Sequence, residues 1–211
     1  MEDENIRLVR RHLAESAAVK ERLAEAAAPV IAEAAVRLAQ AVSGGGKILL
    51  CGNGGSAADC QHIAAELTNR LRASTERPGI PAIALTTDTS YLTARANDCG
   101  FDGVYERLVA TLGARGDALI AISTSGASGN VIRAVQCARE RSMLTIGLLG
   151  GTGGQLAGMV DVAIVVPSPS TQHIQEAHIA VGHILCEILE EALYGEKVAG
   201  GAGRNRSEPP R

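Results

Sequence analysis

Apolar runs of strand length alternate with helix-length segments along most of the chain. The runs occupy residues 48–51, 82–85, 117–122, 144–149 and 162–166. A loop rich in glycine or hydroxyl side chains follows each run, and behind most of these loops the apolar positions return at helical spacing. This alternation predicts an α/β fold in which helices cover both faces of a five-stranded parallel sheet.

Two helices are expected before the first strand. Apolar positions spaced three and four residues apart predict the first helix over residues 3–27. Pro29 suits the first turn of a second helix, which should end near Val42, before Ser43 and three glycines. The sequence therefore predicts an N-terminal helical hairpin, residues 1–43, whose alanine-rich faces favour packing against another subunit.

The rest of the chain divides into an α/β domain, residues 44–195, and a tail, residues 196–211. The last helix is expected to begin near Ser170 and to end near Tyr194, with Gly195 as its C′ residue. The tail ends in GAGRNRSEPPR, which has no large apolar side chain to bury and is predicted to be disordered.

Charge and composition limit the kinds of binding partner that we expect for the protein. A net charge of −3 gives no general attraction to nucleic acid or to an anionic membrane. The apolar runs are too short to span a bilayer, and the amino terminus is charged where a secretory signal is apolar. The five cysteines form no CxxC pair and are interpreted as reduced thiols, so we expect a cytoplasmic protein without nucleic-acid or membrane partners.

The glycine turn after the first strand is a candidate ligand site. The strand breaks at Gly52, and a helix resumes at Ser56 or Ala57. Free backbone N–H groups and the helix dipole favour an anion at such a turn. The segment Asn53–Ser56 should form one wall of a crevice at the carboxyl edge of the sheet. It does not match GxGxxG, so no dinucleotide is predicted.

Hydroxyl side chains gather in the loop after the third strand. They belong to Ser123, Thr124, Ser125 and Ser128, directly before a predicted helix. Hydroxyls and backbone N–H groups can surround a phosphate without a lysine. The alternative is a helix cap with some solvated serines. A helix cap needs only one hydroxyl, so the presence of four favours a phosphate-binding loop.

A third group of candidates combines imidazole, carboxylate and amide side chains. His62 and Glu66 lie one helical turn apart on one helix face. With Gln175 and His183 of the last helix they would offer nitrogen and oxygen ligands to Zn²⁺ or a similar divalent ion. The alternatives are a hydrogen-bonded surface pair and satisfied core histidines. Gln175 and His183 lie roughly 12 Å apart along an ideal helix, so they must lean together or come from different subunits.

Four segments resemble the successive motifs of the phosphoheptose isomerases, which are SIS-domain proteins. They are CGNGGSAADCQHIAAEL, ALTTDTSYLTARANDCGF, ISTSGASGNVI and IQEAHIAVGHIL. The resemblance covers about residues 3–195. It implies a flavodoxin-like SIS fold, conversion of sedoheptulose 7-phosphate to D-glycero-D-manno-heptose 7-phosphate for heptose biosynthesis, a homotetramer with active sites between subunits, and one Zn²⁺ or other divalent ion per subunit.

The resemblance also implies roles for individual residues. The metal ligands would be His62, Glu66, Gln175 and His183. The substrate contacts would be Asn53, Gly54, Gly55, Ser56, Glu66, Asn97, Asp98, Ser123, Thr124, Ser125, Ser128 and Gln175. Moving a carbonyl from C2 to C1 through an enediol requires a proton to leave C1 and return at C2. We expect Glu66 to carry that proton and His183 to move the oxygen-bound proton.

Two non-catalytic alternatives remain at this point, and so does an isomerase or sensor for a different ketose phosphate, because a phosphate loop does not distinguish the length of the sugar. A SIS relative that binds the replication initiator DnaA is similar in both loops but lacks counterparts of Glu66 and His183, so these two residues favour an enzyme. A phosphosugar-sensing SIS regulator would normally carry a DNA-binding domain, and the sequence shows no basic helix-turn-helix segment.

Overall fold

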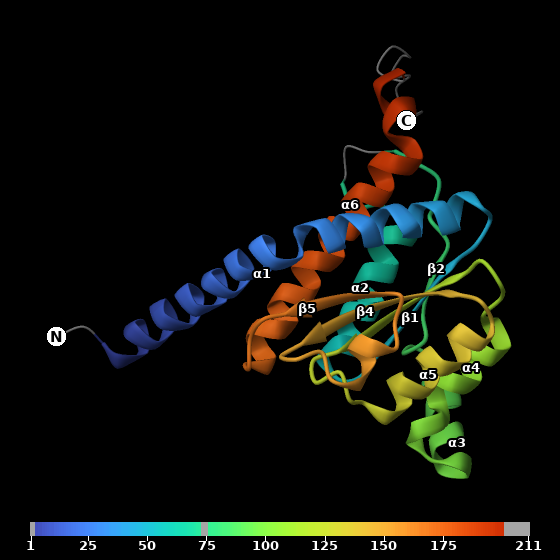
Figure 1. Ribbon diagram of the computed structural model, residues 1–211, viewed down its shortest axis with the longest axis horizontal. Helices are drawn as coiled ribbons and strands as arrows, with labels where there is room; N and C mark the ends of the chain where they lie inside the picture. Colours follow the sequence, from blue (N-terminus) through green and yellow to red (C-terminus); the bar gives the residue numbers. More distant parts are fainter. Residues whose placement is uncertain (1–2, 73–75, 201–211) are drawn as a thin grey trace, which may run out of the picture.

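A five-stranded, wholly parallel sheet forms the centre of the computed structural model, which describes residues 3–72 and 76–200 (Figure 1). The strands are β1 (Ile48–Gly52), β2 (Ala82–Ala84), β3 (Ala118–Ser123), β4 (Leu144–Gly150) and β5 (Val162–Val166). Their order is β2-β1-β3-β4-β5. This is the flavodoxin-like order, and it confirms the predicted fold class.

Helices cover both faces of the sheet. One face packs against α1 (Glu4–Ser43), α2 (Gly55–Thr68) and α6 (Thr171–Gly200). The other packs against α4 (Val104–Leu112) and α5 (Gly129–Glu140). The helix α3 (Thr89–Cys99) has no buried residue and extends away from the sheet beyond α4 and α5 (Figure 1). Two short 3₁₀ helices lie at Phe101–Gly103 and Gln155–Gly158.

The strands are continuous apolar runs in the sequence because both of their faces are buried. Every residue of β1 and β3 is buried. Ile48 and Leu50 point to the core under α1, α2 and α6, whereas Leu49 and Cys51 point to the core under α4 and α5. Alternate side chains of one strand therefore serve two cores, as expected for a covered parallel sheet.

The predicted N-terminal hairpin is wrong, because residues 4–43 form one continuous helix, α1. The buried side chains keep helical spacing on both sides of Pro29, which is itself exposed. They include Val19, Leu23, Ala27, Ile31, Ala34, Ala35 and Leu38. No turn residue separates the two halves, and one unbroken apolar stripe packs against α6 and β5. Its burial outweighs the single backbone hydrogen bond that proline cannot donate.

The first part of α1 projects away from the body of the molecule (Figure 1). Its large apolar side chains are 47–64% exposed. They belong to Ile6, Leu8, Val9 and Leu13. An apolar group on a projecting helix is available to pack against another chain.

The last helix is longer than its sequence predicts. Gly195 does not end it, and α6 continues to Gly200, so residues 196–200 are helical rather than part of a disordered tail. The predicted tail beyond them, residues 201–211, lies outside the described residues. One glycine inside a helix costs about 1 kcal/mol, which the helix-favouring residues after it can outweigh. Within the described chain, no helix combines the length and apolar character that a membrane span requires.

A buried carboxylate ties together the starts of two central strands and makes stability pH-dependent. Asp117 accepts hydrogen bonds from the Lys47 backbone N–H at 2.9 Å, from Lys47 Nζ at 2.6 Å and from the Ala114 N–H at 2.8 Å. Burial by itself raises the pKa of Asp117, but these hydrogen bonds outweigh it and leave the pKa below the usual value.

We expect Asp117→Asn to destabilise the protein by about 1–2 kcal/mol at neutral pH. Because the folded-state pKa is lowered, the carboxylate's contribution is complete above the unfolded value of about 3.9 and is lost as the pH falls through the folded value. Urea unfolding of the wild-type protein and of Asp117→Asn should therefore show a difference in the free energy of unfolding that disappears at acid pH. Glu33→Gln, which removes a 58% exposed partner of Arg37, should show no such pH-dependent difference. A loss of stability in Asp117→Asn that stays constant with pH would contradict the role given to the Asp117 carboxylate.

Candidate active site

The crevice expected at the carboxyl edge of the sheet lies between β1 and β3. The helix after β1, α2, packs on one face of the sheet, and the helix after β3, α5, packs on the other. Such a reversal leaves an opening between the two strand ends. Asn53 and Asn130 exchange two side-chain hydrogen bonds across it, of 2.9 and 2.8 Å. The glycine turn and the hydroxyl loop are thus brought together, as predicted.

Neither helix that begins at the crevice is capped by its own N-cap side chain. Gly54 occupies the N-cap of α2 with a φ of 55°, a left-handed conformation that favours glycine. Ser128 occupies the N-cap of α5, but its hydroxyl lies 3.0 Å from the Ser123 hydroxyl instead. The simple capping interpretation of the hydroxyl loop is therefore wrong. Free backbone N–H groups at two helix starts suit an anionic ligand.

The hydroxyl loop borders open space. Ser125 Oγ accepts a hydrogen bond from the Ala127 N–H at 3.2 Å, which shapes the turn. Thr124 and Ser125 line a hollow of about 280 Å³ together with Gly150–Thr152 and Ser168. A small anionic group has room beside these hydroxyls.

The imidazole and carboxylate candidates also meet. His62 Nε2 lies 2.9 Å from His183 Nε2 and 3.5 Å from Glu66 Oε1. The Glu66 side chain is 24% exposed and that of His62 is 49% exposed, so solvent and ligand can reach the group. The packing of α2 against α6 creates this juxtaposition from positions 121 residues apart.

Gln175 does not join that group within one chain. It lies over the first turn of α2, where a Cβ on Gly55 would fall 2.5 Å from Gln175 Nε2. Gln175 and His183 belong to the same unbroken helix, so about 12 Å of helix axis separates them. The structure therefore places Gln175 beside the glycine turn, and His62 contacts both Glu66 and His183 without the fourth expected ligand.

Asn97 and Asp98 pair with each other rather than with the loops of the crevice. They are exposed near the end of α3, where Asn97 Nδ2 donates to Asp98 Oδ1 at 3.0 Å. Across residues 3–72 and 76–195, no hydrogen bond joins either side chain to the glycine turn or the hydroxyl loop.

His178 is a core residue, in line with the core alternative for histidines of the last helix. It is fully buried, and its Nε2 donates to the Leu149 carbonyl oxygen at 2.9 Å. Burial lowers its pKa to about 4. The imidazole is therefore neutral at physiological pH and takes no part in the candidate site.

Sequence reasoning missed three residues that position the site. Asn130 holds Asn53, as described above. Tyr105 is buried and its hydroxyl donates to the Gly52 carbonyl oxygen at 2.5 Å, which fixes the end of β1. Arg77 is buried and donates to the Glu66 carbonyl oxygen at 2.8 Å, at the carboxyl end of α2. Asn130 was visible as an amide beside the hydroxyl loop, whereas the other two carry no local signal.

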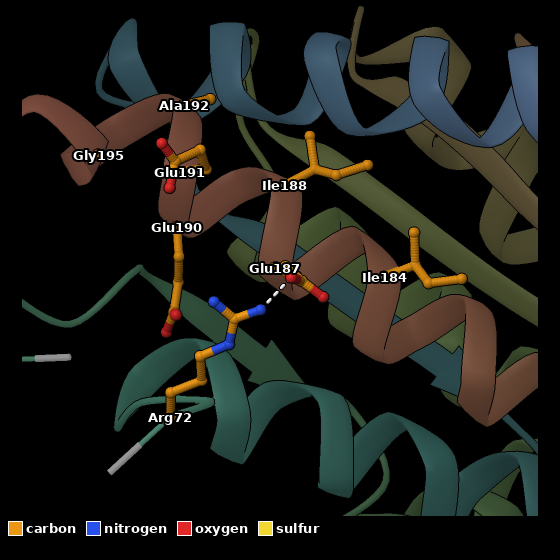
Figure 2. A pocket seen from close by; sticks show the side chains of 8 residues that line it. All are labelled: Arg72, Ile184, Glu187, Ile188, Glu190, Glu191, Ala192 and Gly195. Atoms are coloured by element: carbon orange, nitrogen blue, oxygen red, sulfur yellow. Dashed lines mark hydrogen bonds and ion pairs between the residues drawn. The ribbon is translucent and has the colours of Figure 1, made fainter. Parts of the chain in front are cut away.

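A larger hollow, of about 740 Å³, lies elsewhere along α6 (Figure 2). Its lining residues are Arg72, Ile184, Glu187, Ile188, Glu190, Glu191, Ala192 and Gly195. Arg72 is already paired with Glu187, and two further carboxylates line the space. This acidic character disfavours a phosphorylated ligand, so the candidate site stays at the crevice between β1 and β3.

Comparison with known proteins identifies the family. The sequence model of the SIS domain matches residues 11–150. The phosphoheptose isomerase of Pelodictyon phaeoclathratiforme is 52% identical over 179 residues, which cover 84% of this chain and 85% of that protein. The chain belongs to the phosphoheptose isomerases. It is an enzyme, a sugar-phosphate isomerase, and the family and enzyme class expected from the four motifs are confirmed.

Solved structures of phosphoheptose isomerases have the same fold. The enzyme GmhA from Neisseria gonorrhoeae superposes with a TM-score of 0.83 at 46% identity and covers 88% of this chain and 98% of its own. That from Francisella tularensis gives a TM-score of 0.85 at 38% identity, covering 90% and 100%. The match extends across nearly the whole length of both proteins.

Proposed function

We propose that this phosphoheptose isomerase converts D-sedoheptulose 7-phosphate to D-glycero-D-manno-heptose 7-phosphate through an enediol or enediolate. The observation that carries the proposal is that His62, on the helix α2 that starts at the crevice, contacts both Glu66 of α2 and His183 of α6. The names of relatives about half identical to this chain support the substrate. Incubation of the protein with sedoheptulose 7-phosphate should yield the aldose, which proton NMR distinguishes from the ketose.

The residues of the crevice would bind the sugar phosphate. The hydroxyls of Ser123, Thr124, Ser125 and Ser128, with the free N–H groups at the start of α5, would hold the phosphate. Contacts to the sugar would come from Asn53, Gly54, Gly55 and Ser56 around the start of α2, and from Gln175 of α6, whose side chain lies beside Gly55. In the proposed shared site, Asn97 and Asp98 of a neighbouring subunit would add further contacts. No lysine is needed, because the helix dipole already favours negative charge there.

Glu66 and His183 would perform the proton transfers. Glu66, as a carboxylate, would take the proton from C1 and return it to C2, so one group on one side of the sugar serves both half-reactions. His183 would move the proton between the two oxygens. Its Nε2 lies 2.9 Å from that of His62.

His62, Glu66 and His183 would also hold Zn²⁺ or a similar divalent ion, one per subunit. Two imidazole nitrogens and a carboxylate oxygen fit such an ion chemically, and Gln175 of a neighbouring subunit would complete the set. When bound, the ion would polarise the sugar oxygens and stabilise negative charge on them.

A homotetramer with active sites between subunits, in the cytoplasm, completes the proposal. Two observations support shared sites. Gln175 and His183 are too far apart on one helix to reach one ion, and the projecting part of α1 exposes apolar side chains. All five cysteines lie in the described chain as free thiols, in keeping with a reducing compartment.

Mixing two inactive variants should restore activity if the sites are shared. Glu66→Gln and Asp98→Ala remove groups that we assign to different subunits of one site. Mixed oligomers then contain some sites with neither change. Co-expression with two affinity tags, followed by an assay of the doubly tagged species, would measure this. Mixtures as inactive as either parent would contradict shared sites, and a monomer by light scattering would exclude them.

Replacing Gly55 by alanine should weaken substrate binding without unfolding the protein. The new Cβ would displace the end of the Gln175 side chain, which is flexible enough to move at little cost. We expect KM for the sugar phosphate to rise about tenfold, since a hydrogen bond to a bound ligand is worth about 1–2 kcal/mol. Kinetics of Gly55→Ala, Gln175→Ala and the double variant would test this. KM of the double variant should be no higher than that of Gln175→Ala. Strictly additive effects of the two substitutions would contradict the explanation.

A further inference from the structure

A second group of potential metal ligands lies where the first helix meets the start of the last one. It consists of His12 of α1 and His173 and Glu176 of α6. Within the described part of the chain, this is the one group of three His, Cys, Asp or Glu side chains whose ligand atoms all lie within 4.8 Å of one another. His12 Nε2 is 2.9 Å from Glu176 Oε1, and the His12 and His173 ring centroids are 4.7 Å apart. Two imidazoles and one carboxylate therefore converge on one place.

His173 has an unsatisfied nitrogen in this group. Its side chain belongs to a residue only 6% exposed, and its buried Nε2 has no hydrogen-bond partner. Buried polar atoms in folded proteins almost always have one. His12 and His173 both line a hollow of about 360 Å³, which opens a route for an ion from solvent. An unpartnered buried imidazole nitrogen beside such a space points to a missing ligand.

The helices hold the three side chains at suitable spacing. His173 and Glu176 are three residues apart in the first turns of α6, so they share one helix face. The second carboxylate oxygen of Glu176 accepts a hydrogen bond from the Ser16 hydroxyl, one turn beyond His12 on α1. Ligating carboxylates are commonly oriented by such an outer hydrogen bond. Lys20 Nζ, 3.8 Å from Glu176 Oε2, is a nearby cation that opposes a metal ion here, and Arg22 lines the same hollow.

We propose that His12, His173 and Glu176 bind a divalent transition-metal ion of the zinc class, which links α1 to α6. Two imidazole nitrogens and a carboxylate oxygen are a donor set that Zn²⁺ accepts, with water in the remaining position. This site is separate from His62, Glu66 and His183, because His173 and His183 lie about 15 Å apart along the axis of α6. The ion would fix the direction in which the projecting part of α1 leaves the molecule.

Calorimetric titration with Zn²⁺ tests this in full-length protein that carries His62→Gln and His183→Gln, which removes the other candidate set. We expect one Zn²⁺ per subunit. His12→Asn or His173→Asn should weaken binding by more than about 100-fold, because loss of a ligand exceeds the effect of losing an outer-shell partner. Lys20→Gln should tighten binding several-fold, and this gain cannot arise from misfolding. Co²⁺ should give visible absorption bands of nitrogen and oxygen ligation without thiolate charge transfer.

Two matched controls accompany the titration. Glu15→Gln changes a carboxylate that lines the same hollow but lies outside the group, and Cys99→Ser removes an exposed thiol. Both should leave Zn²⁺ affinity within about twofold, the range of an uninvolved surface group. Absence of Zn²⁺ binding in the starting variant, or binding that persists in folded His12→Asn and His173→Asn, would overturn the proposal. Because isomerase activity is not a readout, this result is independent of the proposed reaction.

Discussion

We expect Glu66→Gln to lower kcat for sedoheptulose 7-phosphate by about 100- to 10,000-fold, the usual contribution of a positioned general base. Glutamine keeps the size of the side chain but cannot accept the proton from C1. Much of the substrate affinity should remain, because the hydroxyl loop that would hold the phosphate belongs to β3 and α5 rather than to α2. Steady-state kinetics and calorimetric binding of the sugar phosphate would separate the two effects.

A matched carboxylate provides the control for this experiment. Glu187→Gln alters an exposed residue of α6 that pairs with Arg72 and lines the acidic hollow (Figure 2). It should retain full activity. If Glu66→Gln kept more than about a tenth of kcat, Glu66 would not be the group that carries the proton, since a lost general base costs at least about 100-fold.

Loss of one partner of the buried Arg77–Glu190 ion pair should give the largest loss of stability. Arg77 has a wholly buried side chain and donates to Glu190 Oε1 at 2.7 Å. It also donates to the carbonyl oxygens of Glu66 and Leu67, each at 2.8 Å. We expect Glu190→Leu to lower the free energy of unfolding by about 3–5 kcal/mol, because it leaves a buried guanidinium without its counter-ion. Urea unfolding at neutral pH measures this.

The double variant Arg77→Met with Glu190→Leu tests the cause. It should be more stable than Glu190→Leu alone, because no charge remains buried without a partner. Arg72→Gln, which breaks an ion pair whose side chains are both more than half exposed, should cost no more than about 1 kcal/mol. Equal losses for the buried and the exposed pair would contradict this account of how the end of α2 is held.

Much of the fold follows from local sequence pattern. The five strands lie within about two residues of their predicted bounds, because buried strands are short apolar runs bounded by turn residues. The N-terminal hairpin failed for a non-local reason. Pro29 indicated a helix start, but the apolar stripe continues in phase across it, and packing against α6 keeps α1 whole. The prediction that the last helix ends at Gly195 was also wrong. One glycine does not end a helix when the residues that follow it favour helix.

Sequence could predict the position of those candidate residues that follow a strand end or share a helix turn. The hydroxyl loop, the glycine turn and the His62–Glu66 pair belong to this group. The meeting of His62 with His183 could be only a hypothesis, because the packing of α2 on α6 decides it. Arg77 was hidden for the same reason. It stands in an unremarkable loop sequence, and its partner Glu190 follows 113 residues later.

The measurement that tests the proposed function most directly is proton NMR of sedoheptulose 7-phosphate incubated with the metal-supplemented protein. Glu66→Gln and His183→Gln would be assayed in parallel. We predict that the wild-type protein forms the aldose 7-phosphate and that both variants, folded and assembled as the wild type is, form little or none. A folded wild-type protein that binds the sugar phosphate without forming any aldose would contradict the proposed reaction.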